Sequence, residues 1–274
     1  KAKYNVKDWF TVNLSIHNDF YDRFKRHERI DERKKVYKSK IFEPRLTLTS
    51  TYFSGHSIIL GVEHTSDELT SDRFVNRKMT TRALHETEYF LQDEWTANKH
   101  WMLSTGVRTN FSKAFGFMYM PKIAVKYSPD EHWAIRANYS MGYRAPSIKE
   151  LFFNWDHLGM FQIRGSEDLK PEKNHYFSLG AEYTHNGFFM NVNAYINKFR
   201  NKIEGVWHIY DMQYNFEYTN LSSQRLYGIE AILKWHFLDH FTLNGTYSYV
   251  NVSKQDGIQV NTTSPHAATA SIDY

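Results

Sequence analysis

His157 is the residue of this sequence best suited to binding a metal centre. It follows Asp156 within residues 144–172, the longest stretch of the chain without a strand-like pattern. Haem iron takes imidazole as an axial ligand, and a carboxylate near the ring can fix its tautomer and raise its basicity. His157 is therefore a candidate metal ligand. The alternative is a solvated loop histidine, because the chain holds 14 histidines.

Tyr143, Arg144 and Pro146 lie where a predicted strand meets this stretch. Proline has no backbone donor, so Pro146 ends the strand pairing. Arg144 closes a series of small or polar residues at alternate positions, which are Arg136, Asn138, Ser140 and Gly142. We favour a structural role for Arg144, and pairing with an anionic ligand is the alternative.

A basic segment lies near the start of the chain. Residues 23–40 hold nine Lys or Arg against three acidic residues, a local net charge of about +6. Such a segment can attract an anionic partner, such as haem propionates, lipopolysaccharide phosphates or an acidic protein. A solvated loop is the favoured interpretation. Nucleic-acid binding is excluded, because no recognisable reading element accompanies the charge.

The sequence lacks the motifs of common enzymes. It has no Gly-rich phosphate loop, no His-Glu-x-x-His and no Gly-x-Ser-x-Gly. The absence of cysteine excludes disulfide scaffolds, thiolate zinc sites, iron–sulfur clusters and cysteine nucleophiles. Acidic residues at strand positions follow no spacing that selects a catalytic pair. We therefore expect no enzymatic activity.

The composition excludes several further classes of protein. The 20 Phe, 19 Tyr and 7 Trp among 274 residues, with only 13 Gly and 6 Pro, fit neither low-complexity disorder nor collagen. The mean hydropathy is -0.62, and no apolar run approaches the roughly 20 residues of a membrane-spanning helix. The formal net charge of +4 is nearly balanced.

Alternation with a period of two carries most of the aromatic residues. In residues 133–143 the odd positions are large and apolar and the even positions small or polar, which predicts a strand with one apolar and one polar face. Similar segments predict an all-β chain of about twelve antiparallel strands. They lie near residues 6–16, 40–52, 57–65, 80–96, 101–111, 116–128, 133–143, 173–185, 188–203, 222–236, 241–253 and 266–274.

The predicted connections alternate between short turns and longer loops. Short turns lie at residues 53–56, 97–100, 129–132, 185–187 and 238–240, and they carry His56, His100, His132, His185 and His240. Longer connections lie at residues 17–39, 66–79, 144–172, 204–221 and 254–265, with a shorter one at 112–115. The turn histidines are interpreted as surface residues, at the end opposite an incoming ligand.

Together these features predict a transmembrane antiparallel β-barrel. Such barrels have short turns at one end, long loops at the other, strands of about ten residues and aromatic girdles at the membrane interfaces. A soluble antiparallel sandwich is the alternative, but the long strands and the alternating connections favour the barrel. The predicted girdle residues are Trp9, Phe10, Tyr52, Trp95, Trp101, Trp133, Tyr143, Phe188, Trp235 and Phe241.

Residues 142–172 carry a family resemblance. Its blocks are Gly142-Tyr143-Arg144-Ala145-Pro146, Asp156-His157-Leu158-Gly159-Met160-Phe161 and Asp168-Leu169-Lys170-Pro171-Glu172. The chain resembles the barrel of a TonB-dependent outer-membrane receptor, and most of all haem or haemoglobin receptors of the Bacteroidetes type. Ser166-Glu167 stands where haem receptors carry Asn-Pro, which leaves His157 as the feature that points to haem. The resemblance thus makes His157 the candidate axial ligand of a haem iron.

The resemblance implies a plugged barrel of about 22 strands. Residues 1–274 are then expected to form only part of the barrel domain, with the plug domain, the first strands and the last strands absent. A complete barrel of about twelve strands is the alternative. The bacterial outer membrane is the implied location. The implied partners are outer-membrane lipid, the protein's own plug and the TonB complex.

The resemblance also implies a function, which is the energised uptake of an iron-containing ligand. Haem, free or on a carrier protein, is the first expectation, as a transported ligand and not as a cofactor. A cobalamin or a siderophore is the alternative within the family, and an adhesive or structural barrel without transport is the alternative outside it. Tyr143, Arg144 and His157 are the implied ligand contacts, and Ala145, Pro146, Asp168 and Leu169 belong to the family signature.

Overall fold

An extended β-sheet makes up most of the chain. The computed structural model describes residues 1–27, 32–75, 77–157, 159–210, 213–238, 240–253 and 264–274, and these form fifteen strands and one helix. The strands are β1 (Ala2–Lys7), β2 (Phe10–His27), β3 (Glu32–Ser50), β4 (His56–Val75), β5 (Lys78–Thr96), β6 (Trp101–Ser112), β7 (Gly116–Tyr127), β8 (Trp133–Arg144), β9 (Asn154–His157), β10 (Phe161–Arg164), β11 (Glu172–His185), β12 (Phe188–Tyr210), β13 (Gln213–Phe237), β14 (Phe241–Val252) and β15 (His266–Asp273). The predicted all-β class is confirmed.

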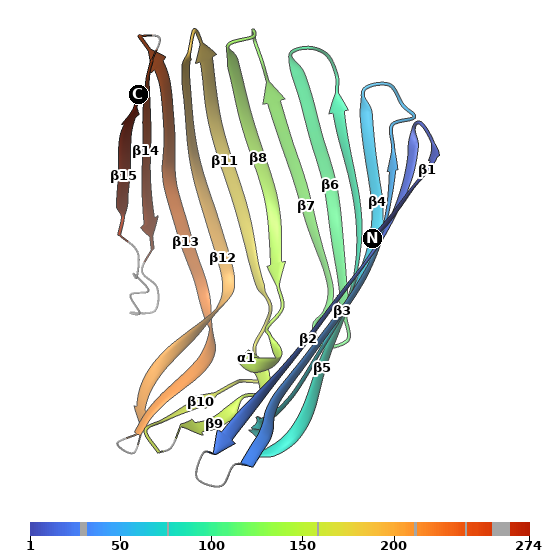
Figure 1. The fold of residues 1–274 in the computed structure, drawn as a ribbon, viewed down its shortest axis with the longest axis vertical. Coiled ribbons are helices and arrows are strands. Elements are labelled where there is room, and N and C mark those ends of the chain that lie inside the picture. The colour runs from blue at the N-terminus through green and yellow to red at the C-terminus, as the bar shows by residue number, and fades with distance from the viewer. Residues whose placement is uncertain (28–31, 76, 158, 211–212, 239, 254–263) are drawn as a thin grey trace.

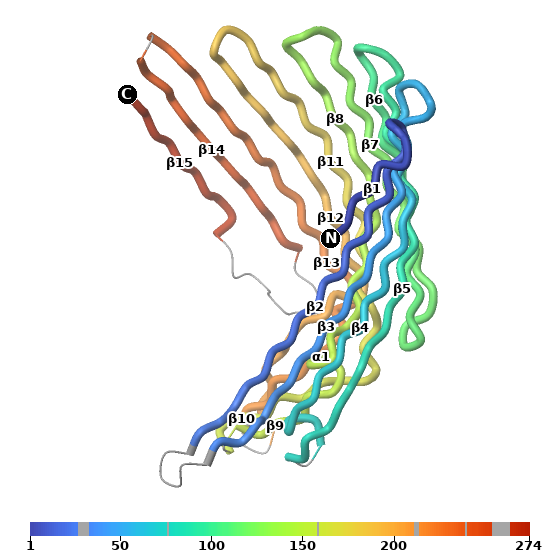
Figure 2. The backbone as a smooth tube through the Cα atoms, turned by 45° about the vertical axis from the view of Figure 1, so that its right-hand side comes forward, coloured from blue at the N-terminus to red at the C-terminus, as the bar shows by residue number. Residues whose placement is uncertain are grey.

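The sheet is a curved wall in which neighbours along the chain pair with one another. β1 to β8 pair in sequence order, β8 pairs with β11, and β11 to β15 continue the antiparallel order. Figures 1 and 2 show that the wall curves around a hollow and stays open. β1 and β15 each pair with a single neighbour among the described strands. The architecture is therefore that of an open segment of barrel wall.

Tight turns close one end of the wall, here called the turn end, at the top of Figure 1. Asp130 accepts hydrogen bonds from the backbone N–H groups of His132 and Trp133 at 2.8 and 2.9 Å. Asn186 and Gly187 have φ values of 44° and 79°, the left-handed pair that a two-residue hairpin turn requires. The predicted turns at residues 53–56, 97–100, 129–132 and 185–187 are confirmed, whereas Asp239 of the fifth lies outside the described residues.

Aromatic side chains gather near the turn end, where the sequence predicts a girdle. Trp9 packs against Tyr52 with ring centroids 4.9 Å apart. Trp133 of β8 packs against Tyr183, the residue opposite it on β11, at 4.8 Å. These contacts tie adjacent strands together through their amphipathic rings, which suit a membrane interface.

Three predicted long connections are wrong, because strand pairing continues through them. Residues 17–39 belong to the hairpin of β2 and β3, residues 66–79 to that of β4 and β5, and residues 204–221 to that of β12 and β13. The alternating pattern fades there, since beyond a lipid layer both faces meet water and neither must be apolar. The backbone ladder nevertheless persists as far as Tyr210 and Gln213, which still pair with each other. The hairpin tips at residues 28–31, 76 and 211–212 lie outside the described residues.

The first predicted strand, residues 6–16, is also wrong. A turn at Asp8 and Trp9 separates β1 from β2, and Lys7 pairs with Phe10 across it. Asp8 is a single turn-forming residue next to Trp9 and Phe10, and Asn13 and Ser15 later in the same run stay within β2, so the pattern does not show the turn. The short connection at residues 112–115 is confirmed, and most of the predicted connection 254–265 lies outside the described residues.

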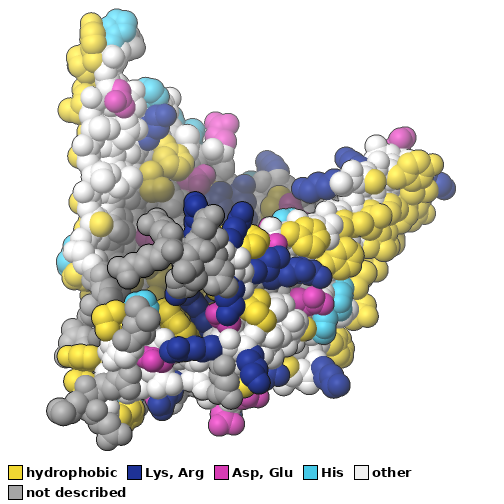
Figure 3. All heavy atoms as spheres, turned by 60° about the horizontal axis from the view of Figure 1, so that its bottom comes forward, with side chains coloured by type: hydrophobic (Ala, Val, Ile, Leu, Met, Phe, Trp, Pro, Cys, Tyr) yellow, Lys and Arg dark blue, Asp and Glu magenta, His cyan; other side chains and the backbone are white. Residues whose placement is uncertain are grey.

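The two faces of the wall differ in chemistry. Figure 3 shows hydrophobic side chains along the outer surface and Lys and Arg side chains within the hollow. Large apolar residues such as Ile16, Leu60 and Leu179 leave about half of their surface exposed on the outside. Ion pairs join neighbouring strands on the inner face, namely Arg45 with Glu63, Arg108 with Glu88 and Arg136 with Glu182. This arrangement suits lipid outside and a polar interior.

The connection between β8 and β11 folds onto the wall and forms its core. It contains the helix α1 (Ile148–Phe152), β9 and β10, and β10 pairs in parallel with the start of β13. No helix in the described part of the chain is long and apolar enough to cross a membrane. One buried cluster joins Ile148 and Phe153 to Leu69 and Phe74 of β4, and a second joins Leu151 and Leu169 to Ile203 of β12. The connection thus bridges two distant parts of the sheet.

Truncation of Ile148 should loosen this connection. The residue is 1% exposed, and removing a buried side chain of this size costs about 2–5 kcal/mol. Ile148→Ala in the full-length protein should therefore raise amide hydrogen exchange across residues 145–171 and leave exchange in β6 to β8 unchanged. Met160→Ala, on the same connection but 58% exposed, is the matched control. Equal exchange in the two variants would contradict the core assignment.

Candidate ligand-binding site

Arg144 holds together the end of the wall opposite the turns, here called the extended end. As the last residue of β8 it donates to Glu150 of α1 at 3.0 and 3.1 Å and to Glu172, the first residue of β11, at 2.7 Å. Glu150 also accepts hydrogen bonds from Ser147 and completes the capping box of α1. Arg144 thereby joins both ends of the connection to its helix. Arg144, Glu150 and Glu172 are called the Arg144 clamp below.

The wall also holds the Asp168-Leu169 block. The Lys170 N–H donates to the Asn220 side-chain oxygen at 2.8 Å, and the Asn220 amide donates to the Lys170 carbonyl at 2.9 Å. The Ile203 N–H of β12 donates to Glu172 at 2.6 Å. Leu169 is buried and Asp168 is exposed. These contacts attach the end of the connection to β12 and β13.

The Glu172 carboxyl stays ionised into the acidic range. Burial raises the pKa of Glu172, but the hydrogen bonds from Arg144 and from the Ile203 backbone lower it by more than burial raises it. The pKa therefore lies below its ordinary value. A carboxyl whose pKa is lowered by folding stabilises the fold above its unfolded pKa, and this contribution is lost as the pH falls through the folded value. The clamp is therefore intact at neutral pH and weakens in acid.

The other residues of the Arg-Ala-Pro block lie at the same rim. Pro146 is fully buried, and Ala145 is half-buried. The Tyr143 hydroxyl donates to Glu86 of β5 at 3.4 Å. The Tyr143 and Arg144 side chains thus contact different groups, and the Arg144 guanidinium is already paired to two carboxylates.

His157 lies elsewhere on the connection, at the end of β9. Its ring lies between Trp155 and Phe161, with a centroid distance of 4.8 Å to each. Phe161 in turn contacts Trp207 of β12 at 5.6 Å. The Nδ1 atom of His157 is buried and has no hydrogen-bond partner among the described residues. His157 therefore belongs to an aromatic cluster at the extended end.

Asp156 does not orient the His157 ring. Neighbouring residues of a strand point to opposite faces, and Asp156 accepts a hydrogen bond from the Gly159 N–H at 2.9 Å and lies 3.8 Å from Arg77. Within the described residues no group of three or more His, Cys, Asp or Glu side chains could hold a metal ion. Since Nδ1 is buried, His157 could offer a metal only its Nε2 atom.

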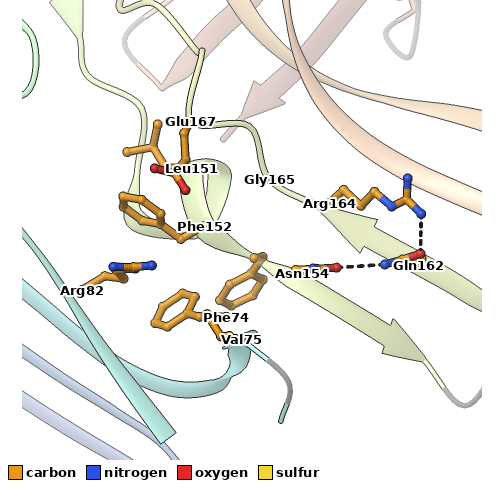
Figure 4. A pocket seen from close by; sticks show the side chains of 11 residues that line it. Phe74, Val75, Arg82, Leu151, Phe152, Asn154, Gln162, Arg164, Gly165 and Glu167 are labelled. Carbon is orange, nitrogen blue, oxygen red and sulfur yellow. Dashed lines mark hydrogen bonds between the residues drawn. The ribbon is translucent and has the colours of Figure 1, made fainter. Parts of the chain in front are cut away.

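A cavity of about 430 Å³ lies between the connection and the ends of β4 and β5. Figure 4 shows that Arg82 lies beside Phe152 at one side of it, with the row formed by Asn154, Gln162 and Arg164 on β9 and β10 at the other. Gln162 donates to Asn154 at 2.8 Å, and Arg164 donates to Gln162 at 2.8 Å. The cavity offers two guanidinium groups, aromatic rings, amide groups and the Glu167 carboxylate to a ligand.

Arg82 forms no ion pair within the described residues, although Glu167 also lines the cavity. Its guanidinium lies 4.8 Å from the centroid of the Phe152 ring, and its Nε atom is buried without a hydrogen-bond partner. In the described part of the chain no carboxylate forms an ion pair with Arg82. A partly buried cation without a partner carries a desolvation cost, which an anionic ligand would offset.

Further cations and rings surround the cavity. A second cavity of about 510 Å³, lined by His208 and Tyr218, lies on the other side of Arg164. The Arg73 guanidinium stacks on the Trp155 ring at 4.0 Å. Burial and the nearby charge of Arg23 lower the pKa of Arg73. The extended end therefore concentrates positive charge and aromatic surface, a combination that binds anionic, ring-containing ligands.

Sequence reasoning missed Arg82, Gln162 and Arg164. Arg82 has the inward position of its strand, but every inward residue of the wall shares that signal. β9 and β10 have four residues each, which is too short for a period to be counted. The cavity exists because the connection folds onto β4 and β5. No local motif predicts this contact between distant segments.

The whole chain, residues 1–274, matches the family model described as TonB dependent receptor-like, beta-barrel. The chain belongs to this TonB-dependent receptor family. The predicted family and the predicted transmembrane barrel are therefore confirmed. Within the family, the turn end is the periplasmic end and the extended end faces the outside of the cell.

The curated relatives include an iron-regulated outer-membrane protein and a ferric enterobactin receptor. The chain is 26% identical over 235 residues to the iron-regulated outer membrane virulence protein of Vibrio cholerae serotype O1, a match covering 81% of the chain and 35% of that protein. It is 24% identical over 197 residues to the ferric enterobactin receptor of Pseudomonas aeruginosa, covering 63% of the chain and 26% of that receptor. The chain thus spans about a third of the first curated relatives that it matches.

Solved structures of other proteins share the fold. A mutant of the ferric enterobactin receptor of Pseudomonas aeruginosa has a TM-score of 0.73 at 17% identity, covering 89% of this chain and 41% of that one. The copper transporter OprC has a TM-score of 0.78 at 14% identity, covering 98% of this chain and 48% of that one. At these identities the likeness shows the fold alone.

The family settles the predicted location and class of the chain. Its relatives are outer-membrane receptors, so the predicted outer-membrane location is confirmed. They are receptors and not enzymes, so the prediction of no enzymatic activity is confirmed as well. The narrower resemblance to haem receptors of the Bacteroidetes type finds no support, because the relatives found are named an iron-regulated outer membrane virulence protein and a ferric enterobactin receptor.

Arg144→Gln should open the extended end of the receptor and leave the turn end intact. It removes charge-assisted hydrogen bonds to two carboxylates, and after a discount for the 45% exposure of the Arg144 side chain we expect a loss of about 1–2 kcal/mol. Limited proteolysis of the full-length receptor should then cleave within residues 145–171 several times faster. Arg136→Gln, which breaks an ion pair with Glu182 on the mid-wall, is the control. Unchanged cleavage in Arg144→Gln would show that the clamp does not hold the connection.

Proposed function

We propose that the complete protein is an outer-membrane receptor for energised uptake of an anionic iron chelate of the siderophore type. The observation that carries the proposal is the unpaired Arg82 guanidinium beside Phe152, in a cavity at the extended end. Ferric catecholate chelates combine negative charge with aromatic rings. A guanidinium next to an aromatic face suits both features.

The names of the relatives favour the same class of cargo. One is a ferric enterobactin receptor, and another is iron-regulated. A solved structure of the same fold is a copper transporter, so family membership by itself does not choose the metal. The choice of an iron chelate therefore rests on the cavity and on the relatives taken together.

The chain supplies the wall and the outer mouth of this receptor. Its inner face carries cross-strand ion pairs such as Arg108 with Glu88, and in the family a plug domain fills the space that such a face surrounds. The plug and the TonB complex are the proposed partners of the complete protein, and outer-membrane lipid is the partner of the apolar outer face. Energised movement of the plug would carry the chelate inward.

Removal of the Arg82 charge should weaken chelate binding. Arg82→Gln in the full-length receptor loses one charge-assisted contact, which corresponds to about a tenfold rise in Kd for ferric enterobactin. Quenching of tryptophan fluorescence on titration measures the change. Lys126→Gln removes an inward charge near the turn end and is the matched control. Wild-type affinity in Arg82→Gln would remove the cavity from the proposal.

Haem is the second candidate cargo, and the surroundings of His157 favour it. The imidazole lies between two aromatic rings at the extended end, and its Nδ1 makes no hydrogen bond within the described residues. Its Nε2 atom could take an axial position on haem iron. The aromatic cluster could cover the apolar faces of a porphyrin.

Haemin titration of the full-length receptor tests this second candidate. If haem is the cargo, the Soret band shifts on binding, and His157→Ala weakens binding and changes the spectrum because alanine cannot ligate iron. His132→Ala, in a turn at the opposite end, should change neither. A wild-type spectrum in His157→Ala would remove His157 as the ligand. A receptor that binds neither haemin nor a ferric siderophore would favour an adhesive or structural barrel.

A further inference from the structure

The outer face of the β2–β3 hairpin changes from apolar to basic along its length. Near the turn end it presents Leu14 and Ile16 on β2 and Leu46 on β3, all of them exposed. Phe20 and Phe42 follow on the same face and are exposed as well. This side of the hairpin therefore begins as a lipid-facing surface and reaches an aromatic pair.

Basic residues continue the same face beyond the aromatic pair. Residues directly opposite each other on two strands share a face, and Lys40 lies opposite Phe20 and Lys38 opposite Asp22. A bulge then shifts the register, so that Lys35 lies opposite Phe24. The outward basic residues used here are Lys40, Lys38, Lys35 and Arg33, and they are called the outer basic patch below.

The outer basic patch begins at the level of the outer membrane interface. A tilted strand crosses the hydrocarbon layer in about ten residues. Phe20 stands ten residues after Phe10, the first residue of β2 at the turn end. The patch therefore starts where lipid headgroups replace hydrocarbon.

The acidic residues on this face do not cancel its charge. Lys35 pairs with Asp22 at 2.7 Å, and Lys40 lies 3.9 Å from Glu68 of β4. Arg33 stacks on the ring of Phe24 at 4.0 Å, which fixes its guanidinium against the hairpin. Among the described residues two carboxylates pair with these four basic residues, so a net positive charge remains.

We propose that the outer basic patch binds the phosphate groups of lipopolysaccharide in the surrounding outer leaflet. The patch faces outward, lies at headgroup height and has the opposite charge, and each Lys or Arg near an anionic lipid surface strengthens the attraction. A guanidinium group can also bind two oxygens of one phosphate in a bidentate contact. Lipid contact at this hairpin is independent of the cargo of the receptor.

Binding of purified lipid A to the full-length receptor in detergent, followed by native mass spectrometry, tests the proposal. The triple variant Arg33→Gln, Lys38→Gln, Lys40→Gln should bind bisphosphorylated lipid A about tenfold more weakly. Lipid A from which both phosphates have been removed should bind the wild type as weakly as the variant. If the triple variant fails to insert, Lys38→Gln alone should show about a threefold loss.

Lys25 and Lys34 provide the matched control, because they lie opposite each other on the same hairpin but on its inner face. The double variant Lys25→Gln, Lys34→Gln should bind lipid A like the wild type. An equal loss in this control, or equal binding of the phosphate-free lipid, would overturn the proposal. Binding of polyglutamate, as a model of an acidic protein, without binding of lipid A would also overturn the proposal.

Discussion

The extended end of this receptor wall depends on one charged interaction, the Arg144 clamp. A connection between β8 and β11 must leave the sheet and return to it, and the clamp fixes both its departure at Arg144 and its return at Glu172. The same guanidinium holds Glu150, whose carboxylate caps α1. Because the helix is thereby positioned, Ile148 and Leu151 can bury against strands on either side of the hollow. The cavity that contains Arg82 exists only in this arrangement.

Local sequence pattern predicts the wall where the membrane imposes a pattern. Alternation identified β6, β7 and β8 closely, because lipid on one side and a polar interior on the other force a period of two. The same reasoning did not predict the long hairpins. β12 and β13 continue beyond any lipid layer, where the backbone pairing persists without the alternation of apolar and polar residues. The turn at Asp8 was missed because one turn-forming residue before Trp9 and Phe10 does not interrupt a strand-like run.

The candidate site was predictable only in part, for a related reason. The Arg-Ala-Pro and Asp-Leu blocks are recognisable in the sequence, yet their contacts are structural, since Arg144 is paired and Leu169 is buried. Arg82 carries no local motif, and it becomes distinctive only when folding places Phe152 beside it without a carboxylate. An arginine is available to a ligand only when no carboxylate pairs with it, and the tertiary structure decides whether one does.

The same residue type therefore has different consequences on the two faces of one wall. Inside, most arginines are neutralised by a carboxylate on an adjacent strand, as Arg45 is by Glu63, so that an unpaired one is available to an anion. Outside, Lys38 and Arg33 extend an apolar face into the headgroup region, where lipid phosphates are the nearest anions. The basic segment that the sequence presents as a single charged stretch is divided by strand alternation into an inner and an outer set. Strand pairing, more than net charge, decides which anion each basic residue can meet.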